Sequence, residues 1–496
     1  MLDAFSRNDE LSKKGRQHKG VNINIDLYHN DPLRPRHNTM FATARQGLCP
    51  LRRKQAESQP NRTMQLNDAI VSATAPSSPE SSSGKPLLMF AFYFPPFGQS
   101  TGRQRTLSFV RHLPAAGWRP IVITARESAY TATDARTLGE IPPGTEVLRA
   151  WGFDIARVTA VAGVYPRWLA TPDRWVSWAA GAFCAGVAAA RRYRARTLWA
   201  TFPAPSALLA AIAVHRWTRI PLVVDLRDPL VYESWPTNRW DRAVYAWLER
   251  LVVCSASAVI LTTPSACSMY RERYRTVPAE RFRVIANGIE DDAVGWNGPQ
   301  AAGSAPITLL HSGLMESPDR DPRAFFAALR LLADRGRLPQ QGVHVVLRAS
   351  GREADYSEAA RAHGVDSMVQ FAPAVMRREA IAEMAGAAGL LLFQGPECNR
   401  QVPAKAYEYL ASRRSIIGLT HKEGDTCALL KDEWGVPYIA DMNSPEEIAQ
   451  TLVRFFDDLR TGQAYVPPTS LIARHSRRAR AADLAQLLDE TVILRA

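Results

Sequence analysis

The sequence predicts an α/β protein built from two Rossmann-like domains, each with its own parallel sheet. The chain has 496 residues, which is too long for one ordinary core and suits two α/β domains with additional segments. An apolar run at 87–94, a loop with Gly98 and Gly102, an amphipathic segment at 103–113 and an apolar run at 120–124 follow one another. This strand–helix–strand order is a βαβ unit, which implies a parallel sheet with a right-handed crossover. The same alternation starts again at residue 307.

Short apolar runs continue the pattern in both halves of the chain. The first half has expected strands at 197–201, 222–225, 258–261 and 283–286, and the second at 307–310, 343–347, 369–371, 389–393, 415–418 and 438–439. We expect an N-terminal domain at 86–294, a Gly/Ala/Pro-rich linker at 295–306, a C-terminal domain at 307–470 and a final segment at 471–496. Ligands of such sheets bind beyond the carboxyl ends of the strands, so the loops after these strands are the candidate site loops.

Residues 1–85 lack sustained hydrophobic periodicity and end in a Ser/Pro-rich stretch at 72–84. Such a segment cannot bury enough apolar area to offset the loss of chain entropy. We therefore expect a disordered, low-complexity N-terminal extension.

Composition and charge narrow the functional classes. The apolar runs are shorter than a membrane-spanning helix requires, and the first residues show no secretory-signal pattern. The six cysteines form no CxxC pair, which favours reduced thiols in the cytoplasm. The net charge of +13 allows nucleic acid, an anionic membrane surface or phosphate-bearing substrates as partners. No nucleic-acid-binding motif is present, so we expect no nucleic-acid partner. We expect a cytoplasmic protein, and peripheral contact with the inner face of the plasma membrane stays open.

The segment 403–411, Pro-Ala-Lys-Ala-Tyr-Glu-Tyr-Leu-Ala, follows the expected strand at 389–393. Its apolar spacing predicts a helix that begins at Pro403. The free N–H groups and the dipole of a helix N-terminus favour a phosphate, and Lys405 adds a positive charge. Glu408 offers a carboxylate to the hydroxyls of a ribose. The alternative is a surface helix whose Lys and Glu are simply solvated.

This segment resembles the donor-site signature of family 4 (group 1) retaining glycosyltransferases of the bacterial polysaccharide-biosynthesis type. The family pattern has two Glu separated by seven residues. Glu408 matches the second, which implies ribose binding, whereas Arg400 occupies the place of the first. Glu397 or Asn399 could take over the missing contact to the sugar ring, or the sugar could be held differently. The resemblance covers about residues 87–490 and implies the GT-B fold, two facing Rossmann-like domains, with the last helix, 474–488, packing back on the first domain.

The loop 311–322 resembles the family loop that carries an Arg and a Lys on the donor pyrophosphate. Here Leu314 follows Gly313 in place of the Arg, and Arg320 lies close to the Lys position. The resemblance implies that Arg320 and Lys405 stabilise the departing diphosphate. An arginine in a solvated loop is the alternative.

In the first domain, the segments 199–206 and 225–229 resemble the same family. Arg227 and Asp228 are candidates to approach the sugar or the acceptor, and Asp228 is a candidate catalytic residue; alternatively, Asp225, Arg227 and Asp228 satisfy one another and merely shape the loop. Gly98, Gly102 and Arg103 resemble the glycine loop of the first domain, where the backbone comes close to a ligand.

The activity implied by the resemblance is transfer of a hexose-type unit, with retention, from a UDP- or GDP-sugar to a hydroxyl of a lipid-linked or saccharide acceptor in surface polysaccharide biosynthesis. No cofactor or metal is expected, although Asp319 and Asp321 formally match the DxD pair of metal-dependent transferases. Two other classes stay open. One is a sugar-nucleotide epimerase of the same fold, and the other is a catalytically silent scaffold.

Overall fold

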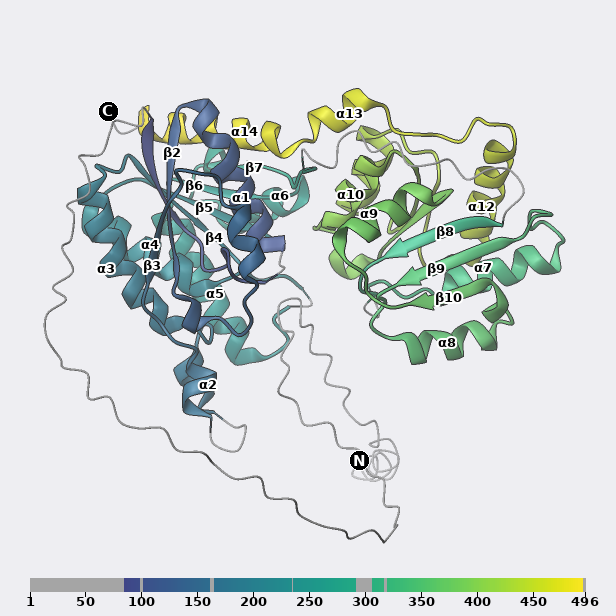
Figure 1. Cartoon of the computed structure of the whole chain (residues 1–496), viewed down its shortest axis with the longest axis horizontal. Coiled ribbons are helices and arrows are strands. Elements are labelled where there is room, and N and C mark those ends of the chain that lie inside the picture. Colours follow the sequence, from purple (N-terminus) through teal and green to yellow (C-terminus); the bar gives the residue numbers. More distant parts are fainter. Residues whose placement is uncertain are drawn as a thin grey trace, which may run out of the picture. The chain divides into compact units, whose positions relative to one another are not determined.

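The computed structural model describes residues 84–98, 101–160, 165–233, 235–290, 306–315 and 319–493. These residues form two entirely parallel sheets with helices on both faces, as predicted (Figure 1). Nearly all of the expected N-terminal extension, and the expected linker apart from Pro306, lie outside the described residues.

The first sheet has the strand order β3-β2-β1-β4-β5-β6-β7. Its strands are β1 (Lys85–Phe90), β2 (Trp118–Ala125), β3 (Glu146–Ala150), β4 (Thr197–Thr201), β5 (Leu222–Arg227), β6 (Ala258–Leu261) and β7 (Phe282–Val284). Strand β3, at the edge of the sheet, has only its last residue fully buried and was not predicted, because it lacks the continuous apolar run of the central strands.

Alternating residues of the central strands enter two different cores. Leu87 and Met89 pack on one face of the sheet with α1 (Thr101–His112), whereas Leu88 and Phe90 pack on the other. That second face is covered by α3 (Val176–Arg192), α4 (Pro205–Thr218), α5 (Arg239–Ser255) and α6 (Pro264–Arg273). Burial on both faces is the physical reason for the unbroken apolar run that predicted β1.

The second sheet has the order β10-β9-β8-β11-β12-β13. Its strands are β8 (Ile307–Ser312), β9 (Val343–Arg348), β10 (Val369–Ala372), β11 (Gly389–Gln394), β12 (Ser415–Thr420) and β13 (Ile439–Ala440). Helices α7 (Arg323–Asp334), α8 (Glu353–Ala362) and α12 (Pro445–Arg460) cover one face. Helices α9 (Arg377–Gly386), α10 (Ala404–Ser412) and α13 (Thr469–Arg474) contribute to the core on the other.

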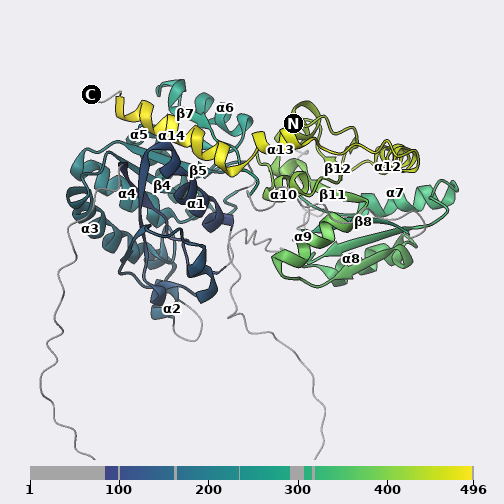
Figure 2. The same cartoon turned by 45° about the horizontal axis from the view of Figure 1, so that its top comes forward.

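The last helix, α14 (Arg477–Ile493), leaves the second sheet and packs beside α1 of the first domain (Figure 2). Its Leu484 and Leu488 join the core that contains Leu87 and Met89. The chain therefore returns to its first domain, as the expected final helix implies. Among the described residues, no helix combines the length and apolar character that crossing a membrane requires.

Candidate functional site

Lys405 and His311 meet at the carboxyl edge of the second sheet. His311 is buried near the end of strand β8, and Lys405 lies in the first turn of helix α10. The Nζ atom of Lys405 is 3.0 Å from Nε2 of His311 and 3.5 Å from the carbonyl oxygen of Leu314. The lysine ammonium is thus held against the loop that follows β8, although only Lys405 was singled out from the sequence.

The partners of His311 favour a proton on Nδ1. This atom lies 2.8 Å from the carbonyl oxygen of Leu391, which can only accept a hydrogen bond. Nε2 lies 3.0 Å from the ammonium of Lys405, which can only donate, and 3.1 Å from the carbonyl oxygen of Gly313, which can only accept. A neutral ring that donates from Nδ1 to Leu391 accepts at Nε2 from Lys405. Burial lowers the pKa of His311 well below its usual value, and the charge of Lys405 lowers it further. His311 is therefore a neutral support for a charged lysine.

Helix α10 begins one residue later than predicted, with Pro403 as its N-cap in an extended conformation. No side chain caps this end, and the N–H of Ala406 donates to the carbonyl oxygen of Pro403 at 3.0 Å. A helix N-terminus without a side-chain cap favours an anion. Ala406, Tyr407 and Leu410 are buried, which anchors the helix on the sheet. The hydroxyl of Tyr409 also accepts a hydrogen bond from the backbone N–H of Ser312, so the helix and the β8 loop are fixed to each other.

Glu408 lies one turn further along α10. Its carboxylate is 3.4 Å from Nη1 of Arg377, at the start of α9. Both side chains are partly exposed, and such a pair contributes little to stability. Glu408 therefore remains accessible to a ligand hydroxyl.

Arg320 and the two aspartates beside it form ion pairs within their own loop. Nε of Arg320 lies 3.3 Å from Oδ2 of Asp319, and Asp321 pairs with Arg323. The carboxylates of the DxD pattern are thus directed to different arginines. Within the described ranges, no group of three or more His, Cys, Asp or Glu side chains is placed to hold a metal ion.

In the first domain, Asp225 is committed to a structural ion pair. Nε of Arg105 lies 2.7 Å from Oδ2 of Asp225, and Nη2 lies 3.1 Å from Oδ1. Both side chains are buried, and Arg105 also donates to the carbonyl oxygens of Ile285 and Ala286. The pair ties α1 to β5 and to the end of the first domain.

Arg227 and Asp228 are not part of the ion pair between Arg105 and Asp225. Arg227 has a φ of 66°, and β5 shifts register between Asp225 and Arg227. Its Nη2 atom donates to the carbonyl oxygen of Gly102 at 3.1 Å, so it supports the glycine loop. Burial raises the pKa of Asp228 to about 6, against the opposing effect of Arg227 and Arg105. A carboxyl group with such a pKa can exchange a proton near neutral pH.

The other candidates of the glycine loop, Gly98, Gly102 and Arg103, differ in their contacts. Arg103 is buried and forms an ion pair with Glu140 at 3.1 Å. Gly102 contributes the carbonyl that Arg227 binds, whereas Gly98 lies in the partly exposed chain before the helix, where an added Cβ would meet nothing within 4 Å. Gly98 therefore shows no steric requirement for glycine.

Arg400 contacts the first domain. Its Nη1 atom lies 2.6 Å from Oε1 of Glu233, in the loop after β5, and this ion pair lowers the pKa of Glu233. The Thr263 hydroxyl donates to the Arg400 carbonyl oxygen at 2.8 Å, and Asp425 accepts hydrogen bonds from Ser265. A small cavity of about 40 Å³ is lined by Glu233 and by residues 396–401. Beside it, Asn399 binds Nδ1 of His421 at 2.9 Å.

Arg477, at the start of α14, is a further site residue that the sequence did not reveal. Burial lowers its pKa to about 10, and repulsion from Arg105, Arg227 and Arg377 adds to this effect, while Glu290 opposes it. These arginines come from helices and strands far apart in the sequence. No local sequence motif contains these arginines, because they come close together only in the folded chain.

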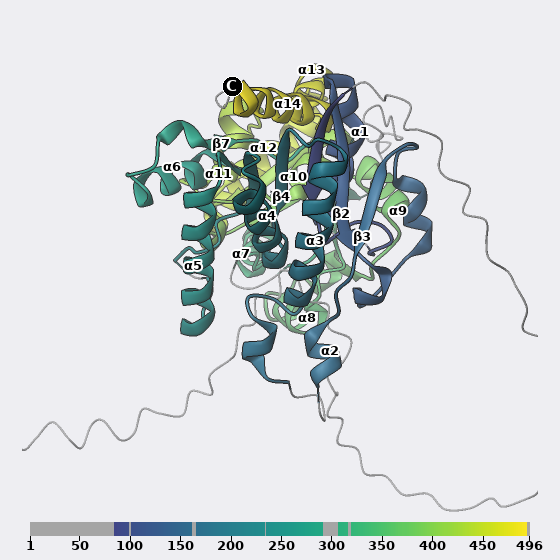
Figure 3. The same ribbon diagram turned by 90° about the vertical axis from the view of Figure 1, so that its left-hand side faces the viewer.

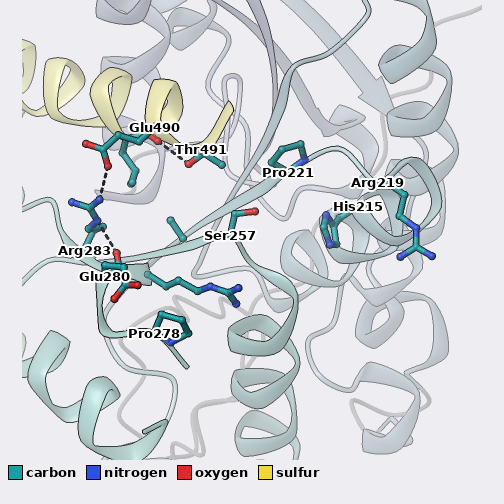
Figure 4. A pocket seen from close by; sticks show the side chains of 12 residues that line it. His215, Arg219, Pro221, Ser257, Pro278, Glu280, Arg283, Glu490 and Thr491 are labelled. Atoms are coloured by element: carbon teal, nitrogen blue, oxygen red, sulfur yellow. Dashed lines mark hydrogen bonds and ion pairs between the residues drawn. The ribbon is translucent and has the colours of Figure 1, made fainter. Parts of the chain in front are cut away.

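A larger hollow, of about 510 Å³, lies at the opposite edge of the first sheet (Figure 4). Its walls include Pro221 and Ser257, which directly precede β5 and β6, and Arg283 and Glu490 form an ion pair there. Ligands of parallel α/β sheets bind at the carboxyl ends of the strands. This hollow is therefore separate from the candidate site.

Comparison with known families finds a match within the first domain. The family model for the glycosyl transferase 4-like domain matches residues 100–288. The candidate residues Gly102, Arg103, Arg227 and Asp228 all lie within this range.

Solved structures are similar over both domains. A glycosyltransferase from Rickettsia africae is 12% identical, with a TM-score of 0.56, over 82% of this chain and 99% of that one. HepE of Anabaena, solved with UDP and glucose, is 17% identical, with a TM-score of 0.55, over 82% and 100%. A putative UDP-N-acetylglucosamine 2-epimerase from Listeria monocytogenes is 10% identical, with a TM-score of 0.50, over 81% and 95%. The predicted GT-B fold is confirmed. Among curated proteins, no sequence relative matches.

Proposed function

We propose that the protein transfers a sugar from a nucleoside diphosphate sugar to a hydroxyl of a saccharide or lipid-linked acceptor, with retention of configuration. The single observation that carries this proposal is the position of Lys405, whose ammonium lies beside the uncapped N-terminus of α10 and the loop after β8. A cation and a helix N-terminus at one sheet edge form a site for a diphosphate.

The charge requirement of the reaction agrees with this site. When the bond from the sugar C1 to the diphosphate oxygen breaks and the acceptor oxygen takes its place, negative charge accumulates on the departing nucleoside diphosphate. Lys405 and Arg320 are proposed to stabilise that charge, in the positive field to which Arg477 and Arg377 add. For this, the guanidinium of Arg320 must leave its ion pair with Asp319 and bind the phosphate instead. The acceptor hydroxyl loses its proton, and we propose that the ionised carboxylate of Asp228 accepts it.

Donor recognition is proposed to involve four further residues. Glu408 would accept hydrogen bonds from the ribose hydroxyls, and Gly313 would let the backbone of the β8 loop approach the phosphates. Arg400 and Asn399 border the small cavity at 396–401, where they would contact the sugar. HepE binds UDP and glucose on the same fold, which supports a UDP-sugar as the first donor to test. We also propose that no metal is needed, since Asp319 and Asp321 pair with separate arginines.

Two alternatives give different products. The similarity to a putative epimerase makes a sugar-nucleotide epimerase the second candidate, because the fold alone does not distinguish the two reactions. With a labelled donor and no acceptor, an epimerase changes the sugar of the nucleotide, whereas a transferase leaves it unchanged or hydrolyses it slowly. A catalytically silent scaffold would bind without producing either product.

The first experiment measures binding of UDP, GDP, UDP-sugars and GDP-sugars by calorimetry and thermal shift. We expect one nucleotide series to bind in the presence of EDTA, and Lys405→Ala to weaken it by at least about tenfold. Lys422→Ala is the matched control, because Lys422 is an exposed lysine of the same domain that pairs with Glu447. If no nucleotide binds, or if both variants bind alike, the proposed donor site is wrong.

A further inference from the structure

Among the described residues of the segment between β3 and α3, five large hydrophobic side chains are exposed. They are Trp151, Phe153, Val158, Tyr165 and Trp168, and we call them the aromatic face. Val158 is 62% exposed and Trp168 is 70% exposed. The segment follows β3 and includes α2 (Ile155–Thr159), which projects from the domain in Figures 1 and 3. Helix α2 contacts the turn Arg167–Ala170, so Val158 and Trp168 lie on neighbouring elements. Large exposed apolar side chains on neighbouring elements indicate an interaction site.

The aromatic face is held in place by tight packing on α3. A Cβ added to Gly181 would lie 2.1 Å from the carbonyl oxygen of Trp151, so the two backbones touch. The hydroxyl of Ser177 donates to the carbonyl oxygen of Phe153 and accepts from its N–H. The buried carboxylate of Asp154 binds Arg174 at 2.6 Å and caps α2. The chain that carries Trp151 and Phe153 and leads into α2 is thus fixed on α3.

Positive charge lies next to the aromatic face. Arg157 of α2 donates to the carbonyl oxygens of Ser128 and Tyr130, and Arg149 donates to those of Pro95 and Ala125. A carbonyl oxygen carries no net charge, so these hydrogen bonds do not neutralise the positive charge of the guanidinium groups as a carboxylate partner would. Arg126 is exposed next to Glu127 at the same loop. Exposed aromatic rings beside arginines are complementary to the interface of a bilayer with anionic lipids.

The sheet places this surface at the reaction edge. All strands of the first sheet are parallel, so the end of β3 lies at the same edge as the end of β5. The aromatic face follows β3, whereas β5 ends at Arg227 and is followed by Asp228. A membrane bound to the aromatic face would therefore meet the edge of the domain that carries these candidate acceptor residues.

We propose that the aromatic face docks the first domain on a bilayer surface containing anionic lipids. Trp168 and Val158 enter the interface, and Arg126, Arg149 and Arg157 attract the headgroups. The docking would also bring a lipid-linked acceptor to the first domain. That second step rests on the proposed transferase function, whereas the docking itself does not.

Co-sedimentation of the full chain with vesicles tests the docking. Vesicles of phosphatidylcholine with phosphatidylglycerol are compared with vesicles of phosphatidylcholine alone, at low and high salt. We expect binding to the anionic vesicles that weakens with salt, and a loss of about tenfold or more in the double variant Trp168→Ser/Val158→Ser. Both side chains are exposed, so this variant is expected to fold normally.

Trp217→Ser provides a matched control. Trp217 is 66% exposed and lies in the last turn of α4. It is two residues along the chain from His215 and from Arg219, which line the hollow at the opposite edge of the sheet (Figure 4). This control is expected to bind vesicles like the unchanged protein. The docking proposal is overturned if the unchanged protein does not bind anionic vesicles, or if Trp168→Ser/Val158→Ser binds them equally well. Nucleotide binding in vesicle-free solution is measured on the same samples, so failure of the donor site is seen separately.

Discussion

The ammonium of Lys405 donates to Nε2 of His311 over 3.0 Å, while Nδ1 of the same ring donates to the carbonyl oxygen of Leu391 over 2.8 Å. The imidazole thus connects the first turn of α10 to the centre of the second sheet. Because the ring is neutral, it can fix the direction of the lysine without cancelling its charge.

Replacing His311 by alanine is expected to weaken nucleotide binding without removing the charge of Lys405. A hydrogen bond to a charged group contributes about 1.5–3 kcal/mol, so we expect the dissociation constant of the nucleotide to rise about tenfold or more. Calorimetry measures it. His344→Ala is the control, since His344 lies on the neighbouring strand β9 and binds only Gln370. Unchanged nucleotide affinity in His311→Ala would contradict the positioning role.

Gly313→Ala should impair both stability and nucleotide binding. Gly313 has a φ of 116°, and an added Cβ would lie 3.0 Å from Nζ of Lys405. The backbone strain costs about 1–3 kcal/mol, and the new methyl group displaces the ammonium. Urea unfolding and calorimetry measure the two effects. Gly336→Ala separates them, because Gly336 has a φ of 58° with open space around it, so that variant should lose stability alone.

Asp228 is expected to make activity and stability depend on pH near 6. Its pKa is raised from 3.8 to about 6, so the folded protein binds more protons than the unfolded chain between these values. The contribution of Asp228 to stability is therefore greatest below pH 4 and is lost as the pH rises through 6, by about 3 kcal/mol in total. Asp228→Asn should remove this loss, which urea unfolding at pH 4, 6 and 8 measures.

If the ionised carboxylate binds the acceptor, the transfer rate should rise as the pH increases through about 6. The Asp228→Asn variant should be slow at every pH. Asp173 is a useful comparison, since burial also raises its pKa to about 6, but it accepts hydrogen bonds from the backbone of Trp175 and Ser206. Asp173→Asn should keep the rise in rate near pH 6. A profile that depends on Asp173 instead of Asp228 would show that the wrong carboxylate was assigned.

The central strands could be predicted from the sequence because both faces of each are buried. Leu88 and Met89 enter different cores, so the whole run is apolar, whereas the partly exposed β3 carries no such signal. At the candidate site, the sequence singled out Lys405 by its place at a helix start. It could not identify His311 as its support, because 94 residues separate the two. The pairing of Arg400 with Glu233 was invisible for the same reason, as the two lie 167 residues apart.

The buried pair of Arg105 and Asp225 should be a structural pair whose loss destabilises the protein. Asp225→Leu leaves the guanidinium of Arg105 without its counter-ion in a buried position, which is expected to cost about 3–5 kcal/mol in urea unfolding. The double variant Arg105→Met/Asp225→Leu removes the stranded charge and should recover part of this loss, although the carbonyl oxygens of Ile285 and Ala286 lose their donor. A double-variant cycle therefore measures the coupling of the pair. If Asp225→Leu instead unfolds like the unchanged protein but no longer transfers sugar, Asp225 belongs to the reaction site, and the structural role derived from its two hydrogen bonds to Arg105 is wrong.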